Sequence, residues 1–323
     1  MLSLSLDITR RPHSFYVTIA ITSGGGYSGS TYRASRPGGQ WFADGIAVAG
    51  ATATEWIMTG PAEGAAISYR IGAQVSNVIE MWMPGDLPAS LRTQGGWWDP
   101  KRAVTTTGGK VTAIADQFGV RPMLQANAVN QPDYAASLAD GGPAMVWPDT
   151  ANNRFVAPTA AFAPAYWMLV LRYRSGAITT FPNEGASPEG DYPSLLSSGA
   201  SPNRVMGDRG TGNLFPASVW TATASRNAAP YAASLLPLSK SLVELQGTPA
   251  SAIWSLGRSG PQIEGDPAFA RAWRGPIFEA LALGGLPDST QRDCAQGCFA
   301  WRNGTQESLP LLHPYKDHAP RLR

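Results

Sequence analysis

The sequence predicts an all-β protein with one short helix near its C-terminus, and three observations lead to this prediction. Charged residues make up only 15% of the chain, whereas it holds 35 glycines and 27 prolines, a composition that suits many strands joined by turns. Short segments with alternating apolar residues recur between clusters of Gly and Pro, as strands do. Helical spacing with both end signals is found in residues 288–304. With 323 residues, the chain is long enough for two hydrophobic cores.

Residues 1–83 predict a small β-sandwich or barrel. Residues 2–8 and 14–22 alternate apolar and polar side chains, and a hairpin is predicted between them. Further short strands, each bounded by Gly or Pro, are predicted over residues 45–51, 54–59, 66–71 and 78–82. This part carries no catalytic or binding motif. It is therefore either a docking module that joins the chain to another protein or a structural extension of the larger domain.

The closing segment of the chain predicts a buried strand followed by the helix. Residues 277–283 form an apolar run of strand length. Asp288, with Gln291 three residues later, forms a capping box that starts the helix. Gly304 ends the helix, because glycine adopts the left-handed conformation of a helix C-terminus with little strain. A second buried strand, at the centre of a sheet, is predicted over residues 166–173.

Six short motifs between Pro84 and Lys316 follow one another in the order found in one known family. They are Pro84-Gly85-Asp86-Leu87-Pro88, Trp97-Trp98-Asp99-Pro100, Gly109-Lys110-Val111 with Asp116, Asn130-Gln131-Pro132-Asp133-Tyr134, Gly142-Pro143-Ala144 with Asp149, and Gly275-Pro276-Ile277-Phe278-Glu279. In this order they resemble the concanavalin A-like, or LamG-like, jelly-roll domains of phage and gene-transfer-agent spike and fibre proteins. The first 83 residues lie outside the resemblance.

The resemblance implies a division of the chain into three parts. Residues 84–316 are expected to form a concanavalin A-like jelly-roll β-sandwich that ends with the short helix. The N-terminal β domain of residues 1–83 precedes it, and residues 317–323 form a C-terminal tail.

The resemblance also implies structural roles for four residues. Trp98 is expected in the core of the sandwich, and we interpret Trp147, on a strand buried on both faces, as a core residue too. Glu279 matches a structural glutamate near the closing strand. His313 matches a His-Pro-Tyr tail, and we interpret it as a packing and capping residue.

Charge and hydropathy argue against nucleic-acid binding and membrane insertion. The net charge is only +2 and the basic residues are scattered, so the chain lacks the basic patch that binds nucleic acid. The longest apolar run, within residues 166–171, is far too short to span a bilayer. Residues 1–8 alternate instead of forming the apolar core of a signal peptide, which predicts synthesis in the bacterial cytoplasm without a leader.

The cysteines and histidines predict no metal or redox site. Cys294 and Cys298 lie one helical turn apart, a spacing that gives poor disulfide geometry, so we interpret them as small buried apolar residues. A metal site would need further ligands, and His13, His313 and His318 are not spaced to supply them.

No catalytic residues are predicted, and the chain is not expected to be an enzyme. The Glu-x-Asp-x-x-Glu strand of retaining glycosidases and the Gly-x-Ser-x-Gly turn of serine hydrolases are both missing. No cofactor is expected. Calcium is the weaker option, with the oxygen ligands Asp149, Asn152 and Asn153 as candidates, because this segment lacks the dense carboxylates of a strong calcium site.

The best candidates for a binding site lie in a loop-rich region, because loops on a rigid sandwich usually carry binding. Sugars are bound by carboxylates, amides and guanidinium groups beside an aromatic face. Two patches have this composition: Asp208, Arg209 and Asn213 with Tyr192 and Phe215, and Arg226 and Asn227 with Tyr231. The alternative for both is an ordinary turn with solvated polar residues.

The resemblance implies a non-enzymatic, carbohydrate-binding adhesin of a virus-like particle. Its expected partners are bacterial surface polysaccharide, other virion proteins through residues 1–83, and further copies of the chain in a homo-oligomer. Its expected location is the particle surface. Two alternatives stay open, a polysaccharide-degrading glycosidase of the same fold and a purely structural virion decoration protein.

Overall fold

The structure is a computed structural model. It describes residues 16–59, 62–148, 154, 156–160, 162–179, 194–197, 204–207, 214–216, 223–230, 234–247, 255–257 and 272–322. The chain divides into two compact units, Met1–Met81 with Arg321–Arg323, and Trp82–Pro320. The smaller unit therefore includes the end of the chain, where the amide of Leu322 donates to the carbonyl of Glu80 at 2.9 Å.

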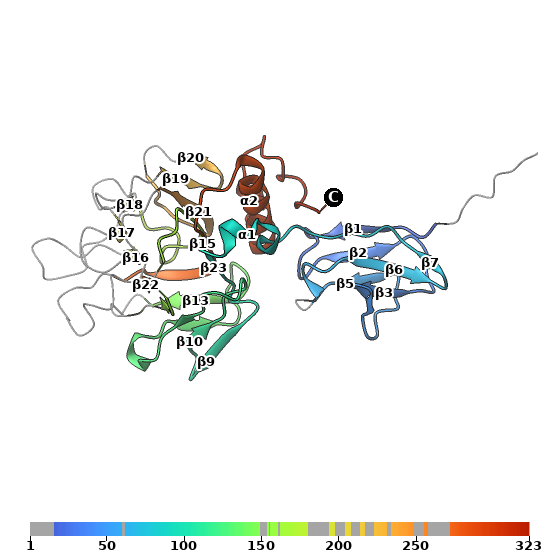
Figure 1. The fold of residues 1–323 in the computed structure, drawn as a ribbon, viewed down its shortest axis with the longest axis horizontal. Coiled ribbons are helices and arrows are strands. Elements are labelled where there is room, and N and C mark those ends of the chain that lie inside the picture. The colour runs from blue at the N-terminus through green and yellow to red at the C-terminus, as the bar shows by residue number, and fades with distance from the viewer. Residues whose placement is uncertain are drawn as a thin grey trace, which may run out of the picture. The chain divides into compact units, whose positions relative to one another are not determined.

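The smaller unit contains two antiparallel sheets in its described part (Figure 1). The first holds β1 (Ile19–Ser23), β2 (Thr31–Ala34) and β5 (Glu55–Ile57). The second holds β3 (Gln40–Ala43), β4 (Ile46–Ala47), β6 (Ile67–Ile71) and β7 (Gln74–Val75). Tyr32 and Trp56 of the first sheet contact Trp41 of the second, with ring centroids 6.2 and 5.7 Å from it. An aromatic core thus joins the two sheets.

The predicted strands of this unit are found in part. Strands β5 and β6 lie within the predicted segments 54–59 and 66–71. Segment 78–82 contributes only isolated bridges, and residues 2–8 lie outside the described residues. Strands β2 and β3 were not predicted, because Gly- and Pro-rich neighbours obscure their alternation and pairing with distant strands forms them.

The larger unit contains a large sheet and a small sheet in its described part. The large sheet has the order β14-β11-β10-β12-β13-β23-β15-β21-β19-β20, with β8 also paired to β23 and β9 to β10. Its strands are β8 (Gly96–Trp98), β9 (Val104–Thr107), β10 (Lys110–Ile114), β11 (Met123–Leu124), β12 (Asp133–Ala135), β13 (Ala144–Trp147), β14 (Ala157–Pro158), β15 (Tyr166–Leu171), β19 (Thr223–Arg226), β20 (Ala229–Pro230), β21 (Ser241–Gln246) and β23 (Gly275–Leu283). The small sheet has the order β18-β17-β16-β22, with β16 (Ser194–Ser197), β17 (Arg204–Gly207), β18 (Leu214–Pro216) and β22 (Ser255–Leu256).

Strand β15 lies at the centre of the large sheet, as predicted for this segment. It pairs antiparallel with β21 on one side and with β23 on the other, and all its residues are buried. Because side chains alternate along a strand, Trp167, Leu169 and Leu171 face one side of the sheet, and Tyr166 with Met168 faces the other. The first face builds the main core.

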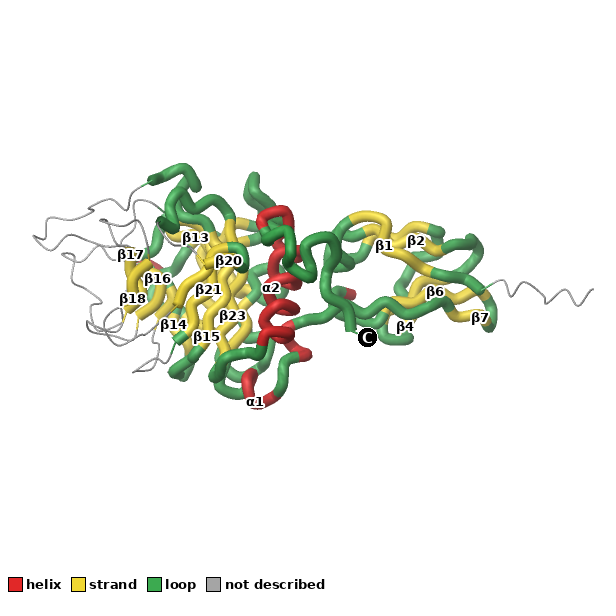
Figure 2. The backbone as a smooth tube through the Cα atoms, turned by 90° about the horizontal axis from the view of Figure 1, so that it is seen from above, coloured by secondary structure: helices red, strands yellow, loops and turns green. Residues whose placement is uncertain are grey.

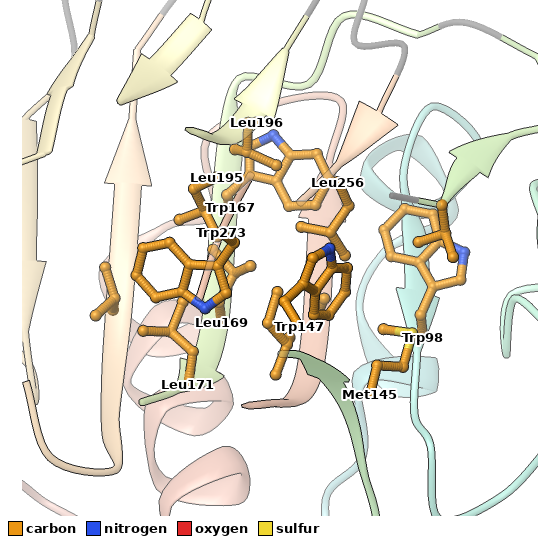
Figure 3. Close-up of a cluster of buried hydrophobic side chains, with 14 of the residues drawn as sticks. Trp98, Met145, Trp147, Trp167, Leu169, Leu171, Leu195, Leu196, Leu256 and Trp273 are labelled. Atoms are coloured by element: carbon orange, nitrogen blue, oxygen red, sulfur yellow. The ribbon is translucent and has the colours of Figure 1, made fainter. Parts of the chain in front are cut away.

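That core combines four tryptophans with many aliphatic side chains (Figure 3). Trp98 and Trp167 stack with ring centroids 5.8 Å apart, and Trp147 and Trp273 are buried in the same cluster. Leu195, Leu196 and Leu256 of the small sheet join it, so the core lies between the two sheets. The predictions that Trp98 and Trp147 are core residues are confirmed.

The opposite face of the large sheet carries the long helix α2 (Ser289–Asn303), which runs alongside the strands in Figure 2. Its predicted ends are confirmed. The Asp288 carboxylate accepts from the Gln291 amide at 2.8 Å, and Gly304 has a positive φ of 69°. Of the two cysteines on this helix, Cys298 is buried and Cys294 is half-buried.

The remaining described helices are short. They are α1 (Ala89–Arg92) and the 3-10 turns Pro84–Asp86, Ala128–Asn130 and Gln306–Ser308. The prediction of an all-β protein with one C-terminal helix is therefore confirmed at this coarse level. Of the helices in the described part of the chain, none has the length and apolar character needed to cross a membrane.

Candidate functional site

Most of the predicted sugar-binding residues lie outside the described residues. This holds for Tyr192, Asp208, Arg209, Asn213 and Tyr231, and also for the calcium candidates Asp149, Asn152 and Asn153. Phe215 belongs to strand β18. What the structure describes is therefore the set of strands from which these segments start and to which they return.

Three of the strand ends at which these segments start or return lie at one end of the small sheet. Strands β17 and β18 pair antiparallel with Gly207 opposite Leu214, so residues 208–213 connect two adjacent strand ends. Strand β16 pairs with β17 so that its first residue, Ser194, lies opposite Met206. Ser194, Gly207 and Leu214 therefore lie at the same end of the small sheet.

In the second patch, the half-buried Arg226 and Asn227 lie at the turn between β19 and β20 and bond to neighbouring backbone. The Arg226 guanidinium donates to the carbonyls of Leu235 and Pro237 at 3.1 and 2.9 Å. The Asn227 side-chain oxygen accepts from the amide of Leu242 at 2.9 Å. Burial lowers the pKa of Arg226. These two side chains fasten the segment before β21, and no strand register links them to the end of the small sheet described above.

Beneath helix α2, a first buried carboxylate cluster centres on Glu279 of β23. Glu279 is fully buried and accepts from Trp97 Nε1 at 2.8 Å and from the Asn303 amide at 2.7 Å. The Arg302 guanidinium joins it to Asp99, which is also fully buried. Burial raises the pKa of Glu279, and the Arg302 charge opposes that rise. We call these five residues the Glu279 cluster.

A second buried cluster centres on Glu244 of β21, which is 1% exposed. Its carboxylate accepts from the hydroxyls of Tyr166 and Ser225 and, at 2.7 Å, from the side-chain amide of Gln296 on α2. The Gln296 carbonyl in turn contacts the His313 ring at 3.0 Å. Burial and the Glu244 charge hold the pKa of Tyr166 well above its usual range, so this phenol stays a donor. We call this the Glu244 cluster.

Both clusters serve packing in this geometry rather than acid–base chemistry. A glycosidase needs two carboxylates that flank and reach the substrate. Glu244 and Glu279 instead point from the sheet into the helix, and protein donors occupy their oxygens. Removing these donors would leave a buried charge unsatisfied, so the clusters hold α2 on the sheet.

Lys240, just before β21, has a partly buried amine with close partners. Its Nζ donates to the carbonyl of Asp140 at 2.9 Å and lies 4.1 Å from the centroid of the Phe278 ring. Arg172 pairs with the Asp140 carboxylate at 2.8 Å. Burial, together with the charge of Lys101, lowers the pKa of Lys240 to about 8. This lysine fastens the loop around Asp140 to the sheet.

Sequence reasoning identified Glu279 and His313 as structural but did not identify the Glu244 cluster. The sequence did carry a signal for it: Glu244 is the only charged residue in the apolar strand Ser241–Gln246, just as Glu279 is in β23. A charged residue at such a position is seldom left unpaired, so it predicts a buried partner. Which residues supply that partner depends on how α2 lies across the sheet.

Within the described residues, no group of three or more His, Cys, Asp or Glu side chains could hold a metal ion. No model of a known protein family matches the chain, and no curated protein sequence matches it either.

Proposed function

We propose that the chain is a non-enzymatic, carbohydrate-binding adhesin on a virus-like particle, a phage or gene-transfer-agent spike or fibre that recognises bacterial surface polysaccharide. One observation carries the proposal. The register of the small sheet attaches the segment of Tyr192 and the connection 208–213 to the same end of one rigid sheet. Binding loops carried side by side on a sandwich are the usual location of a recognition site.

The fold proposed for the larger unit is a concanavalin A-like jelly roll. Two antiparallel sheets that enclose a hydrophobic core support it, because this layering is what a sandwich requires. The order of the six sequence motifs supplies the remaining argument.

In the proposed site, Asp208 and Asn213 accept hydrogen bonds from sugar hydroxyls, and Arg209 donates to ring or carboxylate oxygens. Tyr192 and Phe215 supply aromatic faces for the apolar side of a sugar ring. Such a site binds weakly by itself. Several copies on one particle raise its strength, which is why we propose a homo-oligomer.

The smaller unit is proposed to attach the chain to other virion proteins. It has its own aromatic core around Trp41, so it is built as a separate module and not as a loop of the larger unit. The proposed location is the particle surface, after synthesis in the bacterial cytoplasm.

The proposal is tested by incubating the purified chain with intact encapsulated bacteria, with and without excess free capsular polysaccharide. The length of the polysaccharide chains is measured in the same samples. An adhesin binds the cells, is displaced by free polysaccharide, and leaves its chains intact. Shortened chains would instead establish the glycosidase alternative. Absence of binding across a panel of capsule types would favour a structural decoration protein.

A further inference from the structure

The Glu244 cluster extends into a chain of hydrogen bonds with a fixed direction. At one end the Glu244 carboxylate accepts from the Gln296 amide nitrogen at 2.7 Å, so the Gln296 oxygen must face His313. At the other end the backbone amide of Tyr315 donates to Nδ1 of His313 at 3.1 Å. A backbone amide is only a donor, so Nδ1 carries no proton. His313 therefore carries its proton on Nε2 and donates to Gln296 at 3.0 Å.

These hydrogen bonds can form only with the neutral imidazole ring of His313. Protonation would place a second N–H on Nδ1, directly against the N–H of Tyr315. The residue His313 is 9% exposed, so water has little room to separate the two donors. The hydrogen bond between Tyr315 and His313 must then break.

Two carboxylates and burial act on the ring in opposite directions. Asp293 on α2 and Glu244 on β21 favour the protonated form, whereas burial favours the neutral form and prevails, so the pKa of His313 is lowered. On the segment of residues 310–320, which is called the tail below, the centroid of the Tyr315 ring lies 6.1 Å from that of the His313 ring. The Tyr315 ring also contacts His318. On α2, Arg292 and Cys294 are neighbours of the cluster, the first through Tyr166 and the second through Tyr315.

His313 fixes the tail that follows the turn Gln306–Ser308. Beside it, the Trp301 indole donates to the carbonyl of Tyr315 at 2.9 Å, and Cys294 Sγ lies 3.1 Å from the Tyr315 hydroxyl. Gly297 allows this approach, because a Cβ there would lie 2.6 Å from the Cβ of Tyr315. Tyr315 is thus the point at which the tail lies against α2.

We propose that His313 is an acid-sensitive latch: its protonation separates Tyr315 from the ring and releases the tail, residues 310–320, from helix α2. The neutral ring stabilises the attached tail fully above the ordinary histidine pKa of about 6.5. This contribution is lost as the pH falls below that value through the lowered pKa of the attached state. The tail leads on to residues 321–322, which belong to the smaller unit. The inference is independent of carbohydrate binding.

The test uses the full chain and measures hydrogen exchange of the Tyr315 amide at pH 7.5 and 5.0, corrected for the intrinsic exchange rate. The first variant is His313→Asn, whose side-chain oxygen keeps an acceptor for the Tyr315 amide but does not titrate. The matched control is His318→Asn, which removes a histidine outside this chain of hydrogen bonds. Protection should fall at least tenfold at pH 5.0 in the wild type and in His318→Asn, and should be independent of pH in His313→Asn. Equal protection of the wild type at both pH values would overturn the proposal.

A second measurement keeps the test decisive if His313→Asn does not fold. In the wild type with ¹⁵N-labelled histidine, long-range NMR spectra should show the His313 proton on Nε2 at pH 7.5. The ring should titrate in step with the loss of Tyr315 protection. A proton on Nδ1, or titration without loss of protection, would contradict the latch.

Discussion

Arg302 helps to hold helix α2 on the sheet. Its guanidinium joins the fully buried carboxylates of Asp99 and Glu279 and is itself buried. Replacement by Met keeps most of the volume but removes the nearest cation from both buried carboxylates, which then keep only the longer ion pairs with Lys101 (3.9 Å, to Glu279) and Arg102 (3.7 Å, to Asp99). We expect Arg302→Met to lower the free energy of unfolding by about 3–5 kcal/mol, measured by urea denaturation.

The matched control is Arg33→Ala, which breaks an ion pair with Glu55 whose partners are 61% and 51% exposed. It should change the free energy of unfolding by less than about 1 kcal/mol. If the two substitutions had similar effects, the Glu279 cluster would not hold the helix as described.

Lys240 makes the free energy of unfolding of the larger unit depend on pH in the alkaline range. Burial lowers its pKa to about 8 in the folded chain, from an ordinary value of 10.5. Between these values the unfolded chain binds the extra proton, so the contribution of Lys240 to stability rises with pH. We expect the difference in unfolding free energy between the wild type and Lys240→Met to increase from pH 7.5 to pH 9.5. A difference that stays constant over this pH range would contradict the lowered pKa of Lys240.

For single residues, burial can be predicted from the sequence better than the hydrogen-bond partners can. Trp98, Trp147 and Glu279 were correctly assigned to the interior or to structure, because strand pattern and motif position are local properties. The hydrogen bonds of Glu244 were not predicted, because Gln296 is 52 residues away along the chain. Arg226 and Asn227 were predicted as part of a binding patch, and their hydrogen bonds to residues 237 and 242 could not be read from the sequence either.

At the scale of elements, the start of strand β23 depends on a close backbone approach. Gly275 has a φ of 114°, and a Cβ there would lie 2.4 Å from the carbonyl oxygen of Arg172 and 2.7 Å from the amide of Arg174. Both contacts are with backbone, which has little freedom to move. Gly275→Ala should therefore lower the free energy of unfolding by about 2 kcal/mol or more.

Gly108→Ala separates steric contact from backbone strain. Gly108 also has a positive φ, 57°, but a Cβ there would meet nothing within 4 Å. Its replacement should lower the free energy of unfolding by only about 1 kcal/mol. An equal loss in both variants would mean that strain alone, and not the approach of residues 172–174, explains Gly275.

Elements with local signals were the ones predicted. Helix α2 carries its capping residues within its own sequence, and β15 and β23 carry their apolar runs. Strands of two to four residues, such as β3 and β22, carry no such signal. Their pairing with distant strands defines them, and that pairing cannot be read from one short segment.

At the scale of the whole molecule, two separate cores predict two unfolding transitions in calorimetry. Trp41 is fully buried in the smaller unit and Trp147 in the core of the larger unit. Trp41→Ala should lower one transition temperature and Trp147→Ala the other, because each creates a cavity that costs about 3–5 kcal/mol in its own core. A single transition that both substitutions lower equally would show that the units unfold together.

The candidate binding site could be predicted from the sequence only as a set of neighbouring residue types. Composition indicates a loop-rich region around residues 183–213, but the sequence does not say which strand ends lie together. The register of β16, β17 and β18 supplies that information, since it places Ser194, Gly207 and Leu214 at one end of the small sheet. Strand register depends on long-range pairing, so it lies beyond local pattern.

The central claim is that this sheet end binds polysaccharide, and the most direct measurement is the affinity of immobilised capsular polysaccharide for Asp208→Ala/Arg209→Ala. The control is Arg33→Ala/Glu55→Ala, which removes an equivalent pair of charges from the smaller unit. We predict that the first variant loses at least tenfold in affinity while its unfolding transition is unchanged, and that the control binds like the wild type. Wild-type affinity in the Asp208→Ala/Arg209→Ala chain would contradict the account.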